Sequence, residues 1–284
     1  MLTDRKLQEI ADRLVGVPGI AGVMLGGSRA RGTHADDSDV DLGLYYRAPL
    51  DVDALAALAR ELAGPGAEVT RPGEWGPWVD GGGWLRIDDV LVDWIYRDLD
   101  RVTTAWDDAR AGRYGFHSQV GHPLGVPDFS YVGEMALGRV LADPAGELTA
   151  LRDAAQRYPE ALRERILTQA LWEADFAVLN AGKAVDRGDT AYVAGCLFRA
   201  VELCAHALHA YAGAWLINEK GAVDAAAALP VAPLDFAEVA HGVLAGLGRA
   251  PIDLRAALHT AGLLIDATAA ATGGGRTGRS AHLR

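Results

Sequence analysis

Two aspartates alternate along the apolar segment SDVDL (residues 38–42), shortly after the glycine-rich stretch GGS (residues 26–28). Side chains two residues apart in a β-strand point to the same face, so Asp39 and Asp41 are expected to share one small volume. Carboxylates that close repel each other, and a hard divalent cation such as Mg2+ relieves the repulsion. The backbone N–H groups of the preceding turn suit a phosphate. The pattern predicts metal-assisted phosphoryl chemistry.

A third acid, Asp93, lies in the strongly β-prone segment VLVDWIY (residues 90–96). A lone aspartate in such a segment is costly unless it is paired or bound to a metal. It could pair with Arg86 or Arg97. If its strand lies beside that of Asp41, three carboxylates converge instead. Such a trio would hold two Mg2+ ions, and Asp93 would also act as the general base for an acceptor hydroxyl.

The Gly-Ser pair at 27–28, the segment at 38–42 and Asp93 together resemble the pattern of the polymerase-β-like nucleotidyltransferases. The resemblance covers the first third of the chain. It implies an α/β nucleotidyltransferase domain in which Asp39, Asp41 and Asp93 bind the metal ions. Contact with the nucleotide would come from Gly27, Ser28 and Ser38. The implied reaction transfers a nucleoside monophosphate, AMP from ATP as first choice, to a hydroxyl, and pyrophosphate leaves.

Residues 212–223 (AGAWLINEKGAV), followed by Leu229-Pro230, are similar to a segment of the streptomycin/spectinomycin adenylyltransferases. This second resemblance implies that Lys220 contacts the triphosphate. It also implies a small-molecule acceptor resembling an aminoglycoside, and hence a role in antibiotic resistance. The alternative for Lys220 is an ordinary solvated residue beside Glu219.

Length and composition limit the other possibilities. A chain of 284 residues can form two modest domains, and its hydrophobic fraction of 50% is that of a globular protein. The sequence contains no apolar run long enough for a membrane span, and its beginning is unlike a signal peptide. Cys196 and Cys204 are too far apart within one predicted helix for a disulfide. A cytoplasmic location without membrane contact is therefore expected.

The net charge of −11 bears on the choice of partners. A protein that follows a nucleic-acid backbone usually carries a basic stripe, and none is present, so no nucleic-acid partner is expected. Acidic chains attract cationic small molecules, although the same acidity serves ordinary solubility.

The chain is expected to contain a nucleotidyltransferase domain at 1–131, an α-helical bundle at 132–272 and a flexible tail at 273–284. The first domain should be a mixed β-sheet with helices, interrupted by irregular segments at 64–83 and 112–131 that could bind substrate. Its predicted elements are helices 4–15, 51–62 and 98–111 and strands 20–25, 40–46, 84–87 and 90–96. The second domain should contain helices 132–141, 160–183, 190–214, 219–228, 234–247 and 252–271.

Several side chains have open roles. Arg29 and Arg31 could grip the triphosphate or pair with Asp36 or Asp37. A polar stripe on the predicted helix 190–214 could bind substrate or face solvent, and a zinc site is not indicated by its spacing. Its members are Arg199, Glu202, His206 and His209. Three tryptophans could stack on a ligand or simply pack, namely Trp75, Trp78 and Trp84.

Two other functions are compatible with the same motifs. One is a protein-adenylylating enzyme of the antitoxin type. The other is a regulator that binds nucleotide without turnover, although a pure sensor has no need for all three acids. The sequence leaves open the acceptor, the base preference of the donor and the oligomeric state.

Overall fold

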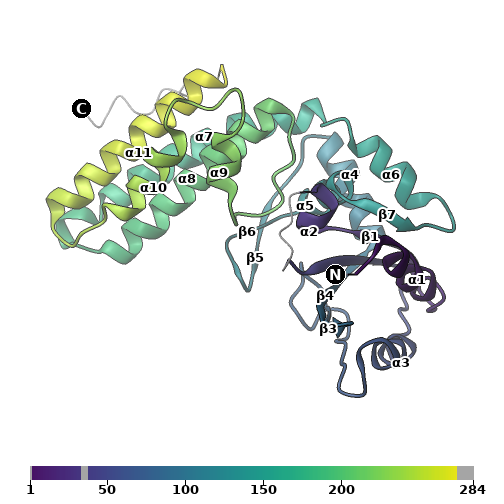
Figure 1. The fold of residues 1–284 in the computed structure, drawn as a ribbon. Coiled ribbons are helices and arrows are strands. Elements are labelled where there is room, and N and C mark those ends of the chain that lie inside the picture. The colour runs from purple at the N-terminus through teal and green to yellow at the C-terminus, as the bar shows by residue number, and fades with distance from the viewer. Residues whose placement is uncertain (1, 33–37, 274–284) are drawn as a thin grey trace. The chain divides into compact units, whose positions relative to one another are not determined.

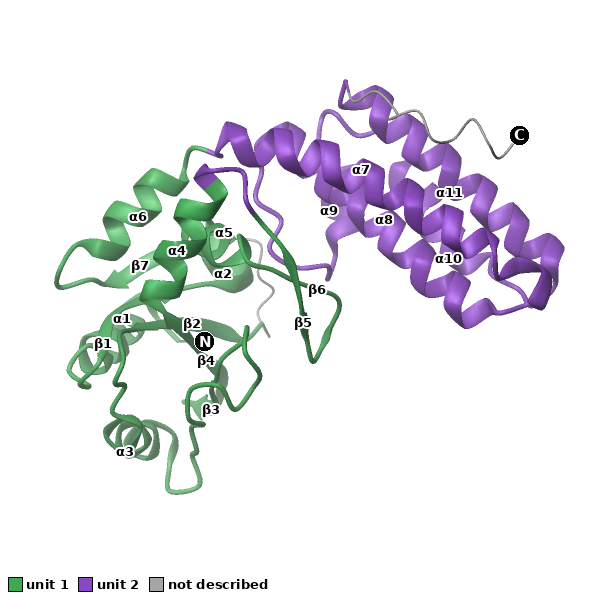
Figure 2. Ribbon diagram, turned by 180° about the vertical axis from the view of Figure 1, so that it is seen from behind, with its two compact units in different colours: residues 1–109, 114–157 green, residues 110–113, 158–284 purple. Residues whose placement is uncertain are grey.

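The computed structural model describes residues 2–32 and 38–273, which form two compact units. Unit 1 contains residues 1–109 and 114–157, and unit 2 contains residues 110–113 and 158–284 (Figure 2). The predicted tail lies, but for Gly273, outside the described residues.

Unit 1 contains a five-stranded mixed sheet with the strand order β3-β4-β2-β1-β7 (Figure 1). Its members are β1 (Ile20–Leu25), β2 (Val40–Tyr46), β3 (Gly82–Ile87), β4 (Val90–Asp98) and β7 (Arg139–Ala142). The central pair β2 and β4 is parallel, and the other neighbours are antiparallel. The predicted mixed sheet with helices is confirmed, and the first two strands match their predicted bounds.

One face of this sheet is the hydrophobic core of unit 1. Alternate strand residues such as Val40, Leu42 and Leu44 are fully buried there, as the period of two in a strand predicts. They pack in one cluster with apolar residues of α1 (Asp4–Leu14) and α3 (Val52–Ala63). Since successive side chains of a strand point to opposite faces, the intervening residues of β2 and β4 lie on the other face of the sheet.

The two core helices have clear start signals. The Thr3 hydroxyl accepts a hydrogen bond from the Lys6 N–H at the start of α1. The Asp51 carboxylate accepts one from the Ala54 N–H at 2.9 Å at the start of α3. Such caps satisfy backbone donors that have no partner within the helix.

The opposite face of the sheet is partly covered by α5 (Ser130–Leu137). Glu134 of α5 forms an ion pair with Arg97 of β4, and an added Cβ on Gly138 would lie 3.0 Å from the side chain of Met24 in β1. Asp41 of β2 and Asp93 of β4 lie side by side in the sheet, and their alternation with the buried residues places them on this same face.

The predicted domain boundary at residue 131 differs from the observed division at Arg157. The predicted helix 132–141 ends early, because residues 139–142 form β7, which pairs with β1 at the edge of the sheet. The helix α6 (Glu147–Ala155) then follows within unit 1. This pairing joins residues more than a hundred positions apart, so local periodicity could not reveal it.

The segment 112–131, predicted to be irregular, contains a hairpin of β5 (Phe116–Gln119) and β6 (His122–Pro127). It follows α4 (Leu99–Arg110), which matches the predicted helix 98–111. The hairpin turns at Gly121, whose positive φ of 85° favours glycine.

Unit 2 is helical, as predicted, and each of its long helices lies close to its predicted bounds. Its elements are α7 (Glu160–Gly182), the 3-10 turn η1 (Val185–Arg187), α8 (Thr190–Ala212), α9 (Ala222–Ala227), α10 (Phe236–Ala245) and α11 (Pro251–Ala271). Along α8 the apolar stripe Val193, Leu197, Ala200, Cys204 and Leu208 is fully buried.

The helix α8 is the most apolar long helix of the described residues. Among them it alone has the length and composition of a membrane span, and 61% of its most apolar stretch is buried within the structure. Burial of this kind is typical of the central helix of a bundle.

Candidate active site

The three predicted acids meet on the partly open face of the sheet. Parallel pairing of β2 and β4 places Asp41 directly beside Asp93, and Asp39 lies just before β2. One carboxylate oxygen from each residue lies within 4.8 Å of the others. Asp39 is exposed, whereas Asp41 and Asp93 are half-buried. Among the described residues, this is the one group whose oxygens converge in a way that could hold a metal ion.

Burial and mutual repulsion raise the pKa of two of the three acids. Burial first, and then the charges of Asp39, Asp93 and Glu134, raise the pKa of Asp41 to about 6, while the charge of Arg31 opposes them. Burial, followed by the charge of Asp39, also raises the pKa of Asp93. Two carboxyl groups of the trio are thus shifted towards their neutral forms, and a hard divalent cation held by the trio would favour their charged forms.

The backbone at the start of α2 (Gly27–Arg31) comes close to the trio because glycine stands there. Gly27 has a positive φ of 61°, and a Cβ added there would lie 1.8 Å from Oδ2 of Asp41. The neighbouring Gly26 N–H donates to the Asp41 carbonyl at 2.8 Å. The sequence GGS therefore places the backbone against the acid, where any side chain at Gly27 would collide with it. Ser28 follows within α2.

Arg29 has a role that neither sequence hypothesis covered. Its guanidinium donates to the Ser38 carbonyl at 2.6 Å and to the Asp39 carbonyl at 2.9 Å. These bonds join α2 to the backbone just ahead of β2 and so fix the position of Asp39. The alternative partners, Asp36 and Asp37, lie outside the described residues.

The alternative for Asp93, a pair with Arg86 or Arg97, is not observed, because both arginines have other partners. Arg97 is buried and makes a bidentate pair with Glu134, at 2.5 Å and 2.7 Å. Arg86 donates instead to the Asp89 carbonyl.

Glu134 is the one residue of this region that sequence reasoning missed. It was detectable as a lone acid within the apolar helix segment SYVGEMAL (residues 130–137). An acid in such a helix needs a partner, and here that partner is Arg97.

Lys220 lies in unit 2, in the loop before α9. It is exposed, and its backbone N–H donates to the Asn218 side chain at 3.0 Å. Its contact with the triphosphate stays a prediction, as do the nucleotide contacts of Ser28 and Ser38.

Comparison with known families bears on the fold around the acids. Residues 4–68, which include Asp39 and Asp41, match the family model of the nucleotidyltransferase domain. Unit 1 carries a nucleotidyltransferase domain. Residues 128–220 match a domain of unknown function (DUF4037), which begins within unit 1 and continues into unit 2.

Among solved structures, the chain is similar to a nucleotidyltransferase-like protein from Exiguobacterium sibiricum 255-15. The two share 13% sequence identity at a TM-score of 0.48, over 95% of this chain and 77% of the other. No curated protein matches the chain significantly.

The polar stripe on α8 is buried rather than solvent-facing. Glu202, His206 and His209 are at most 6% exposed. Burial, followed by the charge of Glu219, raises the pKa of Glu202 to about 7. Burial lowers the pKa of His206 to about 3, so its imidazole is neutral near pH 7. Arg199 instead pairs with Glu173 of α7 at 2.6 Å.

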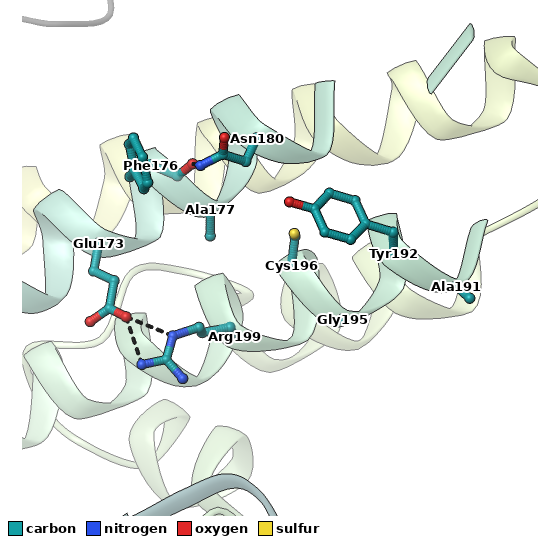
Figure 3. A pocket seen from close by; sticks show the side chains of 9 residues that line it. All are labelled: Glu173, Phe176, Ala177, Asn180, Ala191, Tyr192, Gly195, Cys196 and Arg199. Carbon is teal, nitrogen blue, oxygen red and sulfur yellow. Dashed lines mark hydrogen bonds and ion pairs between the residues drawn. The ribbon is translucent and has the colours of Figure 1, made fainter. Parts of the chain in front are cut away.

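A pocket of about 430 Å³ lies between α7 and α8 in unit 2 (Figure 3). The Glu173–Arg199 ion pair lies at one end, and Tyr192 lies at the other. Because these charges neutralise each other, the pocket offers no unbalanced charge of the kind that the acid trio presents.

Proposed function

We propose that this protein transfers a nucleoside monophosphate from a nucleoside triphosphate, ATP as first choice, to a hydroxyl of a small molecule. The observation that carries the proposal is the convergence of Asp39, Asp41 and Asp93 within 4.8 Å on a nucleotidyltransferase domain. Pyrophosphate is the leaving group of this reaction.

The three acids would bind the metal ions, and one of them would also act as the base. Asp39, Asp41 and Asp93 would hold two Mg2+ ions, which supply charge neutralisation at the phosphates and a more acidic acceptor hydroxyl. Asp93 would orient that hydroxyl and take its proton, helped by the adjacent metal ion.

The nucleotide would be seated by backbone and by cations. Gly27 keeps the turn free of a side chain, so that backbone N–H groups remain accessible beside Asp41. Ser28 and Ser38 would add hydroxyl contacts. Lys220 would contribute charge to the triphosphate, as its resemblance to the antibiotic adenylyltransferases implies.

The acceptor we propose is an aminoglycoside-like antibiotic. The segment around Lys220 supports this choice, and the net charge of −11 suits a cationic acceptor. The protein-adenylylating alternative differs in a measurable product, because label from α-32P-ATP would then move onto a protein in a lysate.

The test follows pyrophosphate release with Mg2+, each nucleoside triphosphate and a panel of aminoglycosides and related antibiotics. Asp41→Asn should abolish release while leaving the circular dichroism spectrum unchanged. Glu202→Gln, which alters a buried carboxyl in the other unit, should retain release. Undiminished release by Asp41→Asn would refute the mechanism. Release that depends on none of the antibiotics would reject the acceptor class.

A further inference from the structure

A row of side chains crosses the open face of the sheet and extends beyond the acids. In the antiparallel pair β3 and β4, Trp84 lies directly opposite Asp93, and Asp93 lies beside Asp41 on β2. Residues opposite each other in neighbouring strands share a face. The Gly26 N–H, bonded to the Asp41 carbonyl, lies at the other end of the row. The order is therefore tryptophan, acid, acid, glycine turn.

Trp84 is the outermost member of the row and is unusually open. Its side chain is 73% exposed, the highest exposure of any tryptophan among the described residues. Trp75 stacks on it, with ring centroids 4.5 Å apart and planes at 20°. Trp78 is used differently, because it packs between His117 and Tyr131. Of the three tryptophans singled out in the sequence, the Trp75–Trp84 pair alone presents a wide aromatic surface to solvent.

The segment that carries Trp75 is fixed at its base. The Thr70 N–H donates to the Gly82 carbonyl and the Gly82 N–H donates to the Thr70 hydroxyl, each at 2.8 Å. These two bonds join the segment to the start of β3. The buried carboxylate of Asp80 accepts a hydrogen bond from the Tyr46 hydroxyl at 2.7 Å.

Gln119 adds a tie from the β5–β6 hairpin. Its side-chain NH2 group donates to the Trp75 carbonyl at 2.5 Å, and its side-chain oxygen accepts from the backbone N–H of Trp78. The aromatic pair therefore stands on an ordered support, which lowers the entropy cost of binding a ring.

We propose that Trp84, backed by Trp75, is the platform on which the acceptor ring lies, and that the reactive hydroxyl is carried directly on that ring. The proposal rests on the proposed function and specifies its acceptor class. Sugars, cyclitols and phenols share this chemistry, since each has a flat or apolar ring face and a hydroxyl on the ring itself.

The position of Trp84 assigns it to the acceptor rather than to the nucleotide. The glycine turn that would receive phosphate lies beyond Asp41, whereas Trp84 lies on the far side of Asp93. Neighbouring strands are about 4.8 Å apart, so a ring lying on Trp84 brings its own hydroxyl, but not one on a long side arm, to the carboxylate of Asp93. Asp93 is the acid proposed to take the proton of that hydroxyl.

Saturation-transfer NMR tests the platform without requiring turnover. The probes are myo-inositol and 2-deoxystreptamine as cyclitols, N-acetyltyrosinamide as a phenol, and α,β-methylene-ATP with Mg2+ as the nucleotide. In the wild type, ring protons of the cyclitols or of the phenol should receive saturation, and which of the two does so identifies the source of the ring. Trp84→Ala should weaken this binding about tenfold, and Trp84→Phe should restore most of it.

Trp172→Ala is the matched control. Trp172 is 42% exposed and stacks on Phe176 in unit 2, so its loss should leave the transfer unchanged. The proposal is overturned if no ring probe receives saturation or if Trp84→Ala binds it as the wild type does. It is also overturned if Trp84→Ala loses saturation of the adenine protons, because Trp84 would then hold the nucleobase. Trp84-dependent ring binding without any pyrophosphate release would reject the proposed function and leave the platform standing.

Discussion

Asp41 in unit 1 and Glu202 in unit 2 are both carboxyl groups whose pKa is raised first by burial and next by a like charge. The pKa of Asp41 rises to about 6 and that of Glu202 to about 7. By this measure alone, Glu202 would be the better candidate for a functional acid. What surrounds the two groups is different.

The difference is one of geometry. Parallel strand register places the oxygens of Asp41 and Asp93 together with those of Asp39, within 4.8 Å. Glu202 is on a helix whose buried neighbours on the same face, His206 and His209, are neutral near pH 7 because burial lowers the pKa of each. A raised pKa therefore marks burial in both units, and converging oxygens distinguish the unit that can bind a cation.

Of the experiments that follow, the largest effect should come from moving Asp41 without removing it. Gly27→Ala places a methyl group 1.8 Å from the Asp41 carboxylate, so the acid must shift. We expect nucleotidyl transfer to fall about a thousandfold, because correct placement of a metal ligand is worth several kcal/mol. Pyrophosphate release measures the loss.

Gly32→Ala is the matched control for backbone strain. Gly32 has a similar positive φ of 69°, yet an added Cβ there meets no atom of the described residues within 4 Å. It should cost about 1 kcal/mol of stability and leave most of the activity. Equal losses of activity in the two variants would mean that strain in the turn, and not the position of Asp41, controls the site.

A second experiment compares the two acids directly. Isothermal titration calorimetry with MgCl2 should show binding to the wild type that Asp41→Asn weakens about a hundredfold or more, since a ligand is lost. Glu202→Gln should leave the Mg2+ affinity unchanged. If Glu202→Gln also lost the cation, the contrast between the two units would not hold.

Local sequence pattern predicted the strands that build the site. The apolar segments 20–25 and 40–46 gave the bounds of the first two strands, and the spacing of two residues gave the shared face of Asp39 and Asp41. Whether Asp93 lies beside them depends on which strands pair. The sequence alone did not show that pairing, so the convergence of all three acids was predicted only on the assumption that the strands are neighbours.

Features that depend on distant contacts were not predictable in this way. Residues 139–142 have the composition of a helix end, but pairing with β1 makes them a strand. Arg29 was expected to meet charges, and its donors instead meet carbonyls about ten positions along the chain. The α8 stripe was weighed as a solvent face because polarity in sequence does not reveal what packs over it.

The pH dependence of the free energy of unfolding tests the description of Glu202 in unit 2. The pKa of Glu202 rises from 4.5 to about 7 on folding, so the folded protein holds this proton more tightly than the unfolded chain does. Ionisation above pH 4.5 therefore costs folding free energy, and the cost grows until the pH exceeds about 7. Glu202→Gln should stabilise the protein at pH 8 by about 2 kcal/mol, a value reduced for solvent screening, and by little at pH 4.

Thermal unfolding at the two pH values measures this effect. The midpoint of Glu202→Gln should exceed that of the wild type at pH 8, and the two midpoints should converge at pH 4. A destabilised Glu202→Gln at pH 8 would show that the ionised carboxylate has a stabilising partner. Glu202 would then resemble the acids of unit 1 more closely than its surroundings indicate.

The smallest effect concerns how each unit uses an arginine. Arg29 donates to the Ser38 and Asp39 carbonyls, whereas Arg199 pairs with the Glu173 carboxylate. Arg29→Ala leaves the three acids in place but frees the backbone that positions Asp39, so pyrophosphate release should fall about fivefold to tenfold. That loss is about 1 to 1.4 kcal/mol, less than its charge-assisted hydrogen bonds are worth, because Arg29 acts on the reaction only through the position of Asp39. Arg199→Ala should leave release unchanged. Since Arg29 acts through the position of Asp39, raising the Mg2+ concentration should recover part of the lost rate, and a loss that Mg2+ does not reduce would place Arg29 on the nucleotide instead.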